Sequence, residues 1–424
     1  MNRNEIIYPG ESTVKDNKIK GATQEDSAVT PSDEEKPRDP DPNNPGDYKV
    51  ERVALSGKET MDWGLEILAI PPLWSSTQGE GVTIAVLDSG IAYNHPDFYD
   101  AFERFQHYKY KNFRKSLFQA VLAYKDFTGS PFGAADMVGH GTHVAGIIAA
   151  RRNNGGIVGV APRAKLLIGK VLKDNGRGSP EALAEGIIWA SDHKKSKIDI
   201  ISISLGCSDY SQKVHDAIKV AKDKGIFVIC SAGNNGTNLD AVDYPARLEE
   251  TVAVGAIDRR QKVPYYSSQG EQVDIVAPGD QVLSTYPPNT IAVLSGTSMA
   301  TPFVSGVIAL MLAKHRKRNI KSDTPIENLE QLKEHLLKTS IDLGPEGPDP
   351  AYGYGLINPA DLLHSNAAKV ISLSGEEDFS VPGVKKLRQF FGRQISSTGN
   401  GKKHLEGSLR NRSGEIRGGI KIKF

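Results

Sequence analysis

Six apolar runs rich in β-branched residues constrain the fold of this chain more than any other feature of its sequence. The runs are mostly continuous rather than alternating, and they are Val82–Leu87, Leu166–Leu172, Ile198–Ile203, Ile226–Cys230, Thr251–Ile257 and Val273–Val276. Continuous runs of this length are typical of parallel strands that are covered on both faces. We therefore expect a buried, mostly parallel sheet.

Helical segments separate several of these runs. Residues 140–152 are rich in alanine, residues 180–193 follow Ser179 as a plausible N-cap, and residues 211–224 are amphipathic and end before Gly225. Strands that alternate with helices indicate a parallel sheet with right-handed crossovers. The sequence thus predicts an α/β fold with three layers, in which helices flank a central, mostly parallel sheet.

The two ends of the chain differ in composition from this central region. Residues 1–60 contain 13 acidic and 9 basic residues, and the Pro- and Asp-rich stretch 31–47 has no apolar periodicity. Residues 365–424 contain 12 basic and 5 acidic residues, together with many Gly, Ser and Asn. We expect a disordered acidic extension or short propeptide over 1–60, one folded domain over 61–364, and a basic, mostly irregular tail over 365–424.

Composition argues against several classes of protein. The chain has 52 basic and 51 acidic residues, so a general nucleic-acid-binding surface is not expected. Its two cysteines, Cys207 and Cys230, are too few for a disulfide scaffold or a Cys-rich zinc site. The sequence has no continuous apolar run of about 18 residues, and residues 1–30 lack the apolar stretch of a signal peptide. These features predict a cytoplasmic protein without a membrane span.

Three short segments place reactive side chains at the ends of predicted elements. Asp88 ends a buried strand, His140 begins a helix in Gly-His-Gly-Thr-His, and Ser298 begins another helix in Gly-Thr-Ser-Met-Ala-Thr-Pro. Each residue taken alone is more often a cap or a turn former. In the order Asp, His, Ser, the three segments together resemble the subtilisin-like serine peptidases.

The resemblance extends over most of residues 61–364. It runs without gaps through residues 140–162 and resumes at five further motifs, which are Ile201–Gly206, Ser231–Asn234, Tyr244–Ala246, Val276–Gly279 and Tyr354–Pro359. It implies the subtilisin-like fold and a serine endopeptidase closest in character to the intracellular subtilisins. Residues 61–364 would then be the peptidase catalytic domain.

The resemblance also implies the role of each catalytic residue. His140 would take the proton of the Ser298 hydroxyl and return it to the leaving amine, because a serine hydroxyl is a poor nucleophile without an adjacent base. Asp88 would fix the tautomer of His140 and stabilise the imidazolium. Asn234 matches the family's side-chain donor to the oxyanion of the reaction intermediate.

A groove for an extended peptide is implied as well, since a substrate would add a strand between two Gly-rich edges. The residues expected to form the groove are Gly176, Arg177, Gly178, Ser204, Leu205, Gly206, Ser231, Ala232 and Gly233.

Acidic residues point to the specificity of this groove. Asp243 falls near the floor of the pocket for the residue before the cleaved bond, where a carboxylate would favour Lys or Arg. Alternatively, Asp243 turns outward or binds a cation together with Asp240. Asp136, four residues before His140, is a further candidate for a neighbouring subsite, or else a surface acid.

A calcium site is implied by the loop that follows the histidine helix. The expected donors, a carboxylate, a side-chain amide and backbone carbonyls, come from Asp97, Arg151, Asn153, Gly155 and Ile157. Two adjacent arginines, Arg151 and Arg152, are unfavourable neighbours for a divalent cation unless they point to solvent. We expect one structural Ca²⁺.

The expected partners are peptides or unfolded proteins as substrates. An N-terminal segment, with Ile6–Pro9 as a candidate, would block the groove in the same molecule. The alternative is a catalytically regulated or silent peptide-binding homologue that docks to an anionic partner through its basic tail. The sequence argues against a silent protein, because the three catalytic residues and Asn234 are all present.

Overall fold

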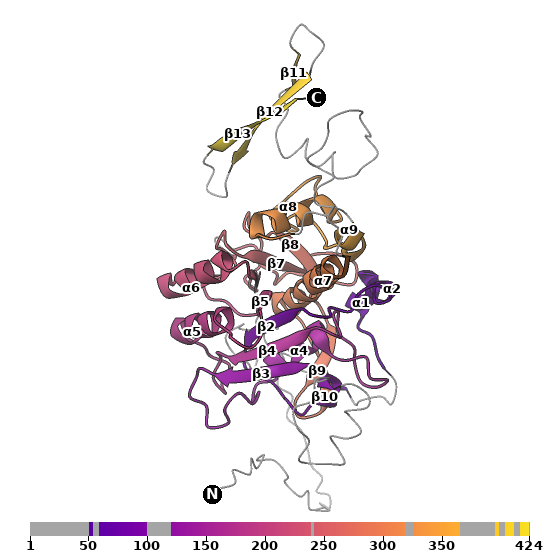
Figure 1. Ribbon diagram of the computed structural model, residues 1–424, viewed down its shortest axis with the longest axis vertical. Coiled ribbons are helices and arrows are strands. Elements are labelled where there is room, and N and C mark those ends of the chain that lie inside the picture. Colours follow the sequence, from indigo (N-terminus) through magenta and orange to yellow (C-terminus); the bar gives the residue numbers. More distant parts are fainter. Residues whose placement is uncertain are drawn as a thin grey trace, which may run out of the picture.

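The computed structural model describes residues 51–53, 59–99, 120–238, 241–318, 326–364, 395–397, 403–410 and 416–423 (Figure 1). Its centre is a seven-stranded sheet in the order β3-β4-β2-β5-β6-β7-β8, and every neighbouring pair of strands is parallel. The strands are β2 (Thr83–Asp88), β3 (Val121–Asp126), β4 (Lys165–Lys170), β5 (Ile200–Ile203), β6 (Phe227–Ser231), β7 (Val252–Ile257) and β8 (Ile275–Pro278). The expected parallel sheet is confirmed.

Helices cover both faces of this sheet. Helices α5 and α6 pack against each other on one face, and α4 and α7 pack on the other (Figure 1). Their bounds are α4 (His140–Ala149), α5 (Pro180–Ser191), α6 (Gln212–Asp223) and α7 (Thr297–Arg318). The Ser179 oxygen accepts a hydrogen bond from the first turn of α5, as predicted, and Ser211 caps the first turn of α6 in the same way. The three-layer α/β architecture is therefore confirmed.

Helix α7 runs through the middle of the fold. By length and composition, Thr297–Lys317 could cross a membrane, but its most apolar window is completely buried inside the protein. Polar residues such as Ser298, Thr301 and Ser305 interrupt the apolar ones, which is why the sequence shows no long continuous run here. The helix is the core helix of this domain, and its first turn carries Ser298 at the surface of the core.

Smaller elements surround the sheet. The hairpin of β9 (Val282–Tyr286) and β10 (Thr290–Leu294) pairs with β1 (Glu51–Val53) and packs on α4. There the imidazole of His143 contacts two carbonyls of the hairpin, Val282 O at 3.1 Å and Ala292 O at 3.0 Å. The remaining elements are α1 (Trp63–Ile67), α2 (Ile70–Leu73), the short 3₁₀ helix η1 (Pro96–Phe98), α8 (Leu329–Thr339) and α9 (Pro359–His364).

Only three short parts of the predicted C-terminal tail, residues 395–397, 403–410 and 416–423, are described. Its described residues form an antiparallel sheet of β11 (Ile395–Ser397), β12 (Lys403–Arg410) and β13 (Ile416–Lys423). In β13, Ile420 and Ile422 alternate with lysines, which is a strand pattern despite the neighbouring pair of glycines. The candidate blocking segment Ile6–Pro9 lies outside the described residues, and the domain boundaries at 60 and 364 stay predictions.

Candidate active site

The first half of the site joins the end of β2 to the start of α4. Asp88 is the last residue of β2 and is completely buried, while His140 is the first residue of α4. The Nδ1 of His140 lies 2.8 Å from Oδ1 of Asp88, and the backbone N–H of Ser89 donates to the same oxygen at 2.7 Å. Because a carboxylate only accepts, His140 donates through Nδ1, and in the neutral imidazole Nε2 is then the nitrogen that can accept a proton.

The electrostatic surroundings of His140 favour its charged form. Burial, the largest effect, would by itself lower the pKa of the imidazole. The negative charge and hydrogen bond of Asp88, assisted by the charge of Asp136, outweigh burial and raise the pKa of His140 above its ordinary value. A raised pKa makes this imidazole a stronger base for a hydroxyl proton.

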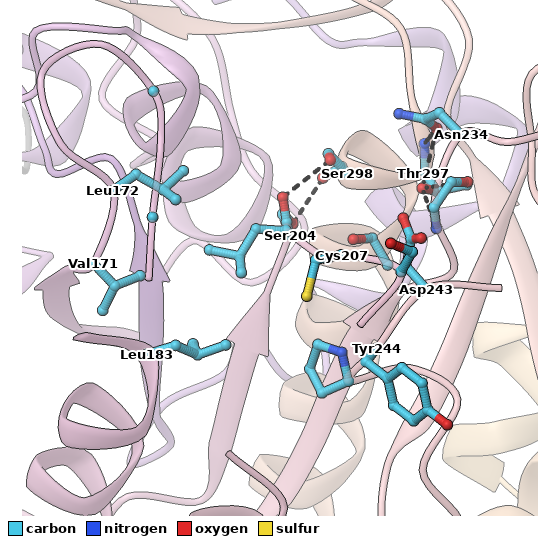
Figure 2. Close-up of a pocket in the computed structure, with 18 of the residues that line it drawn as sticks. Val171, Leu172, Leu183, Ser204, Cys207, Asn234, Asp243, Tyr244, Thr297 and Ser298 are labelled. Atoms are coloured by element: carbon cyan, nitrogen blue, oxygen red, sulfur yellow. Dashed lines mark hydrogen bonds between the residues drawn. The ribbon is translucent and has the colours of Figure 1, made fainter. Parts of the chain in front are cut away.

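Ser298 lies in the first turn of α7, on the pocket that His140 also lines. Its Oγ donates to the carbonyl oxygen of Ser204 at 3.0 Å, and Oγ of Ser204 donates back to the carbonyl of Ser298 at 2.9 Å (Figure 2). These two bonds fix the serine between the start of α7 and the end of β5.

Asn234 caps the start of the serine helix. Its Oδ1 accepts from the backbone N–H of Thr297 at 3.0 Å and from the Thr297 hydroxyl at 3.2 Å, which directs Nδ2 away from the helix (Figure 2). A Cβ on Gly296 would lie 3.4 Å from Nδ2 of Asn234 and 3.7 Å from the backbone N of Ser298. The two nitrogens therefore flank an open space beside Gly296, where they can donate to a negatively charged oxygen.

His140, Ser204, Asn234, Thr297 and Ser298 line a pocket of about 700 Å³. Figure 2 shows Val171, Leu172 and Leu183 on one side of it and Cys207, Asp243 and Tyr244 on the other. The pocket includes nearly all the predicted groove residues, which are Gly176, Arg177, Gly178, Ser204, Leu205, Gly206, Ser231 and Gly233. The exception is Ala232, which is completely buried behind the wall and bonds through its backbone to Val254 and Asp243.

Asp243 lies inside the pocket wall rather than turning outward. A Cβ on Gly233 would lie 2.5 Å from Oδ2 of Asp243, and a Cβ on Gly206 would lie 2.8 Å from its Cβ, so the side chain fits only between two glycines. The amide of Asn235 donates to Oδ1 at 2.9 Å. Burial raises the pKa of this carboxyl, although Asn235 and the charge of Arg247 oppose the rise. Asp240, its suggested partner in a cation site, lies outside the described residues.

Asp136 is neither a subsite residue nor a surface acid. It is 6% exposed and accepts five hydrogen bonds within 3.1 Å. Its distance from His140 along the chain can be read from the sequence, but no sequence pattern indicates that residues 136–142 fold back over the carboxylate. Sequence reasoning also missed Ser89 and Gly296, whose only signal is their place inside the Asp88 and Ser298 motifs.

The predicted calcium loop wraps around Asp97. Oδ2 of Asp97 accepts from the backbone N–H of Ile157 at 2.9 Å, and a Cβ on Gly156 would lie 2.1 Å from that oxygen. The amide of Asn153 donates to the carbonyls of Pro96 and Tyr99, which ties the loop to the segment that carries Asp97.

The two arginines of this loop have different surroundings. The guanidinium of Arg151 donates to the carbonyls of Pro162 and Ala164. That of Arg152 lies over the ring of Trp74, 4.9 Å from its centroid, and 3.7 Å from the Glu59 carboxylate. Because Arg151 is only 2% exposed, its guanidinium does not point to solvent and stays an unfavourable neighbour for a divalent cation in this loop, although carboxylate and backbone oxygens are the donors that calcium prefers. Among the described residues there is no cluster of three or more His, Cys, Asp or Glu that could hold a metal ion.

Comparison with known proteins agrees with this geometry. The family model described as the subtilase family matches residues 79–355, which include Asp88, His140, Asn234 and Ser298. The chain belongs to the subtilase family. It is thus a serine endopeptidase with the subtilisin-like α/β fold.

Three relatives illustrate the likeness to other subtilases. The chain is 39% identical over 288 residues to the intracellular serine protease of Paenibacillus polymyxa, covering 66% of this chain and 80% of that protein. It is 38% identical over 257 residues to the major intracellular serine protease of Bacillus subtilis (strain 168), covering 58% and 74%. It is 36% identical over 301 residues to subtilisin Savinase of Lederbergia lenta, covering 71% and 97%.

Proposed function

We propose that this subtilase cleaves peptides and unfolded proteins through a catalytic triad of Asp88, His140 and Ser298. The observation that carries the proposal is the 2.8 Å contact between His140 and the buried Asp88, on a pocket that His140 and Ser298 line together. An extended peptide in this pocket would bond through its main chain to the edges at 176–178 and 204–206, with little regard to sequence.

The geometry supports the following order of steps. His140 accepts the Ser298 proton through Nε2, and Oγ attacks the peptide carbonyl. Asn234 Nδ2 and the backbone N–H of Ser298 stabilise the oxyanion, assisted by the positive end of the α7 dipole. His140 then protonates the leaving amine to give an acyl-enzyme, which water hydrolyses by the same steps in reverse order.

Asp243 supports a preference for Lys or Arg before the cleaved bond. One of its oxygens is bonded to Asn235 and the other lies against Gly233, inside the pocket wall. A basic guest would pair with this half-buried carboxylate, whereas an apolar guest would desolvate it without compensation. We therefore assign Asp243 as the determinant of basic specificity.

Asp243→Ser is expected to lower kcat/KM for peptides with Arg before the cleaved bond by about 100-fold, because truncating one partner of a desolvated charge pair costs several kcal/mol. The kcat/KM for matched Phe peptides should stay constant or rise. Asp209→Ser is the matched control, since it removes an exposed carboxylate from the same pocket without touching its floor. A wild-type preference for Phe over Arg would contradict the assignment.

We also propose that Asp97 and the 151–157 loop hold a structural Ca²⁺. Bound calcium would stabilise the loop and, through Thr60, whose N–H donates to Gly156 O, the start of the domain. Chelation should lower Tm by about 5–10 °C, which is the effect of removing a ligand whose free concentration is roughly 100 times its Kd. Asp97→Asn should unfold at the same temperature with and without chelator. An unchanged wild-type Tm after chelation would count against the site.

Two of the relatives are named intracellular serine proteases. On that likeness we propose a cytoplasmic location for this protein, which cell fractionation followed by immunoblotting would test.

A further inference from the structure

A second buried carboxylate lies beside the triad and binds both segments that carry Asp88 and His140. Oδ1 of Asp136 accepts from the Ser89 hydroxyl at 2.9 Å, from Gly139 N–H at 2.7 Å and from Val138 N–H at 3.1 Å. Oδ2 accepts from the backbone N–H and the hydroxyl of Thr142, at 2.8 and 2.6 Å. The Asp136 side chain therefore accepts hydrogen bonds both from the start of α4 and from Ser89, which follows the last residue of β2.

Ser89 completes the connection between the two segments. Its hydroxyl donates to Asp136 and accepts from the N–H of Gly141 at 2.8 Å. Its own N–H donates to Asp88 Oδ1, the oxygen that also bonds His140. Its carbonyl accepts from the completely buried Lys170 at 2.6 Å. Ser89, which follows Asp88, is therefore bonded directly to Gly141, which follows His140, and through Asp136 to Gly139 and Thr142.

The α4 start needs this external support. Its N-cap residue, Gly139, is in the left-handed region at φ 97° and has no side chain with which to cap the helix. A Cβ there would lie 2.3 Å from the ring of Tyr286, so a capping residue cannot replace it. Asp136 supplies acceptors for the N–H groups of Gly139 and Thr142 instead, and His140 lies between them.

Asp136 also acts on His140 through its charge. Around His140, the charged or titratable groups are Asp88 at the end of β2, Asp136 before α4, His143 one turn along α4, and Lys170 behind Ser89. Burial lowers the pKa of His143 to about 3, so His143 is neutral near pH 7. Asp136 adds to Asp88 in raising the pKa of His140.

We propose that Asp136 is a positioning residue for catalysis, which holds the Asp88 and His140 segments in register through Ser89 and the first turn of α4. This inference rests on the proposed triad. Asp136 does not touch the substrate. Removing the Asp136 carboxylate should lower kcat more than it changes KM, because a small displacement of a catalytic base strongly reduces the rate of the chemical step.

Two variants separate position from charge. Asp136→Asn removes the charge and turns an amide N–H₂ toward donors, so kcat should fall about 100-fold, with KM changed less than threefold. The acid limb of its kcat/KM profile should move to lower pH. Ser89→Ala removes only the bridge and leaves the charge, so its kcat should fall about 10-fold with the acid limb in place. Thermal melts and circular dichroism would show that both variants are folded.

The outcomes distinguish this inference from the triad itself. If Asp136→Asn and Ser89→Ala both keep kcat within twofold of wild type, Asp136 is not a positioning residue, even when Ser298 is shown to be the nucleophile. If Asp136→Asn does not fold, Ser89→Ala decides alone, and wild-type kcat in that variant overturns the inference. Failure of the triad would instead show in wild type, as a protease that a serine-directed fluorophosphonate does not inhibit.

Discussion

Ser298→Ala is expected to reduce kcat for peptide hydrolysis by about 10⁶-fold, the magnitude established for the triad serine of subtilisin. The structure gives the reason, since Oγ of Ser298 is the hydroxyl at the start of α7 on the pocket that His140 also lines. The activity that remains should come from binding and oxyanion stabilisation alone. Initial rates on an unfolded protein and on a chromogenic peptide would measure the loss.

Ser204→Ala is the control for this substitution. It removes the neighbouring hydroxyl, which donates to the Ser298 carbonyl, but keeps the Ser204 carbonyl that Ser298 Oγ contacts. Its activity should stay within about tenfold of wild type, because a single neutral hydrogen bond is worth about 1 kcal/mol. Equal activity of Ser298→Ala and wild type would contradict the account. Sequencing the N-termini of both proteins would also show whether wild type alone removes an N-terminal segment.

Asp88→Asn is expected to reduce kcat by about 10⁴-fold, the effect of the same change in a serine protease triad. Oδ1 of Asp88 accepts hydrogen bonds from both His140 Nδ1 and Ser89 N–H. An asparagine side chain that turned its N–H₂ group to this side could accept neither bond. His140 would then lose the acceptor that fixes its tautomer. A folded protein with low kcat and little change in KM would be the expected result.

The pH dependence of the same variant follows from the raised pKa of His140. The base must be neutral, so activity is present above the pKa of His140 and is lost as the pH falls through it. Asp88 raises the pKa of His140 above the ordinary histidine value of 6.5. The activity of the wild type should therefore begin to fall at a pH higher than it would for an unperturbed histidine. Asp88→Asn should move this acid limb to lower pH. An acid limb that does not move would show that another group titrates.

The fold and the main site residues could be predicted because their signals are local. Continuous apolar runs predicted the inner strands, since both faces of β2, β5, β6 and β7 are buried. The edge strand β3 is only partly buried and has charged residues at its end, so its sequence lacks such a run and does not predict a strand. The hairpin of β9 and β10 was missed as well, because its short runs are divided by polar residues.

Other features depend on side-chain directions that no sequence pattern records. Asp136 and Asp243 are both acids near the predicted site, yet one is buried under α4 and the other lies in the pocket wall. Arg151 and Arg152 are adjacent in sequence, yet the first is buried against backbone carbonyls and the second lies over the ring of Trp74. Such differences arise from tertiary packing, which acts on residues far apart in the chain.

Reaction with a fluorophosphonate, followed by mass spectrometry of the digested protein, would identify the nucleophilic serine. We expect one covalent adduct on Ser298, formed by the wild type and formed far more slowly by Asp88→Asn, because the reagent needs an activated serine hydroxyl. A wild-type protein that hydrolyses peptides while Ser298 stays unlabelled, or that carries the label on another serine, would contradict this expectation.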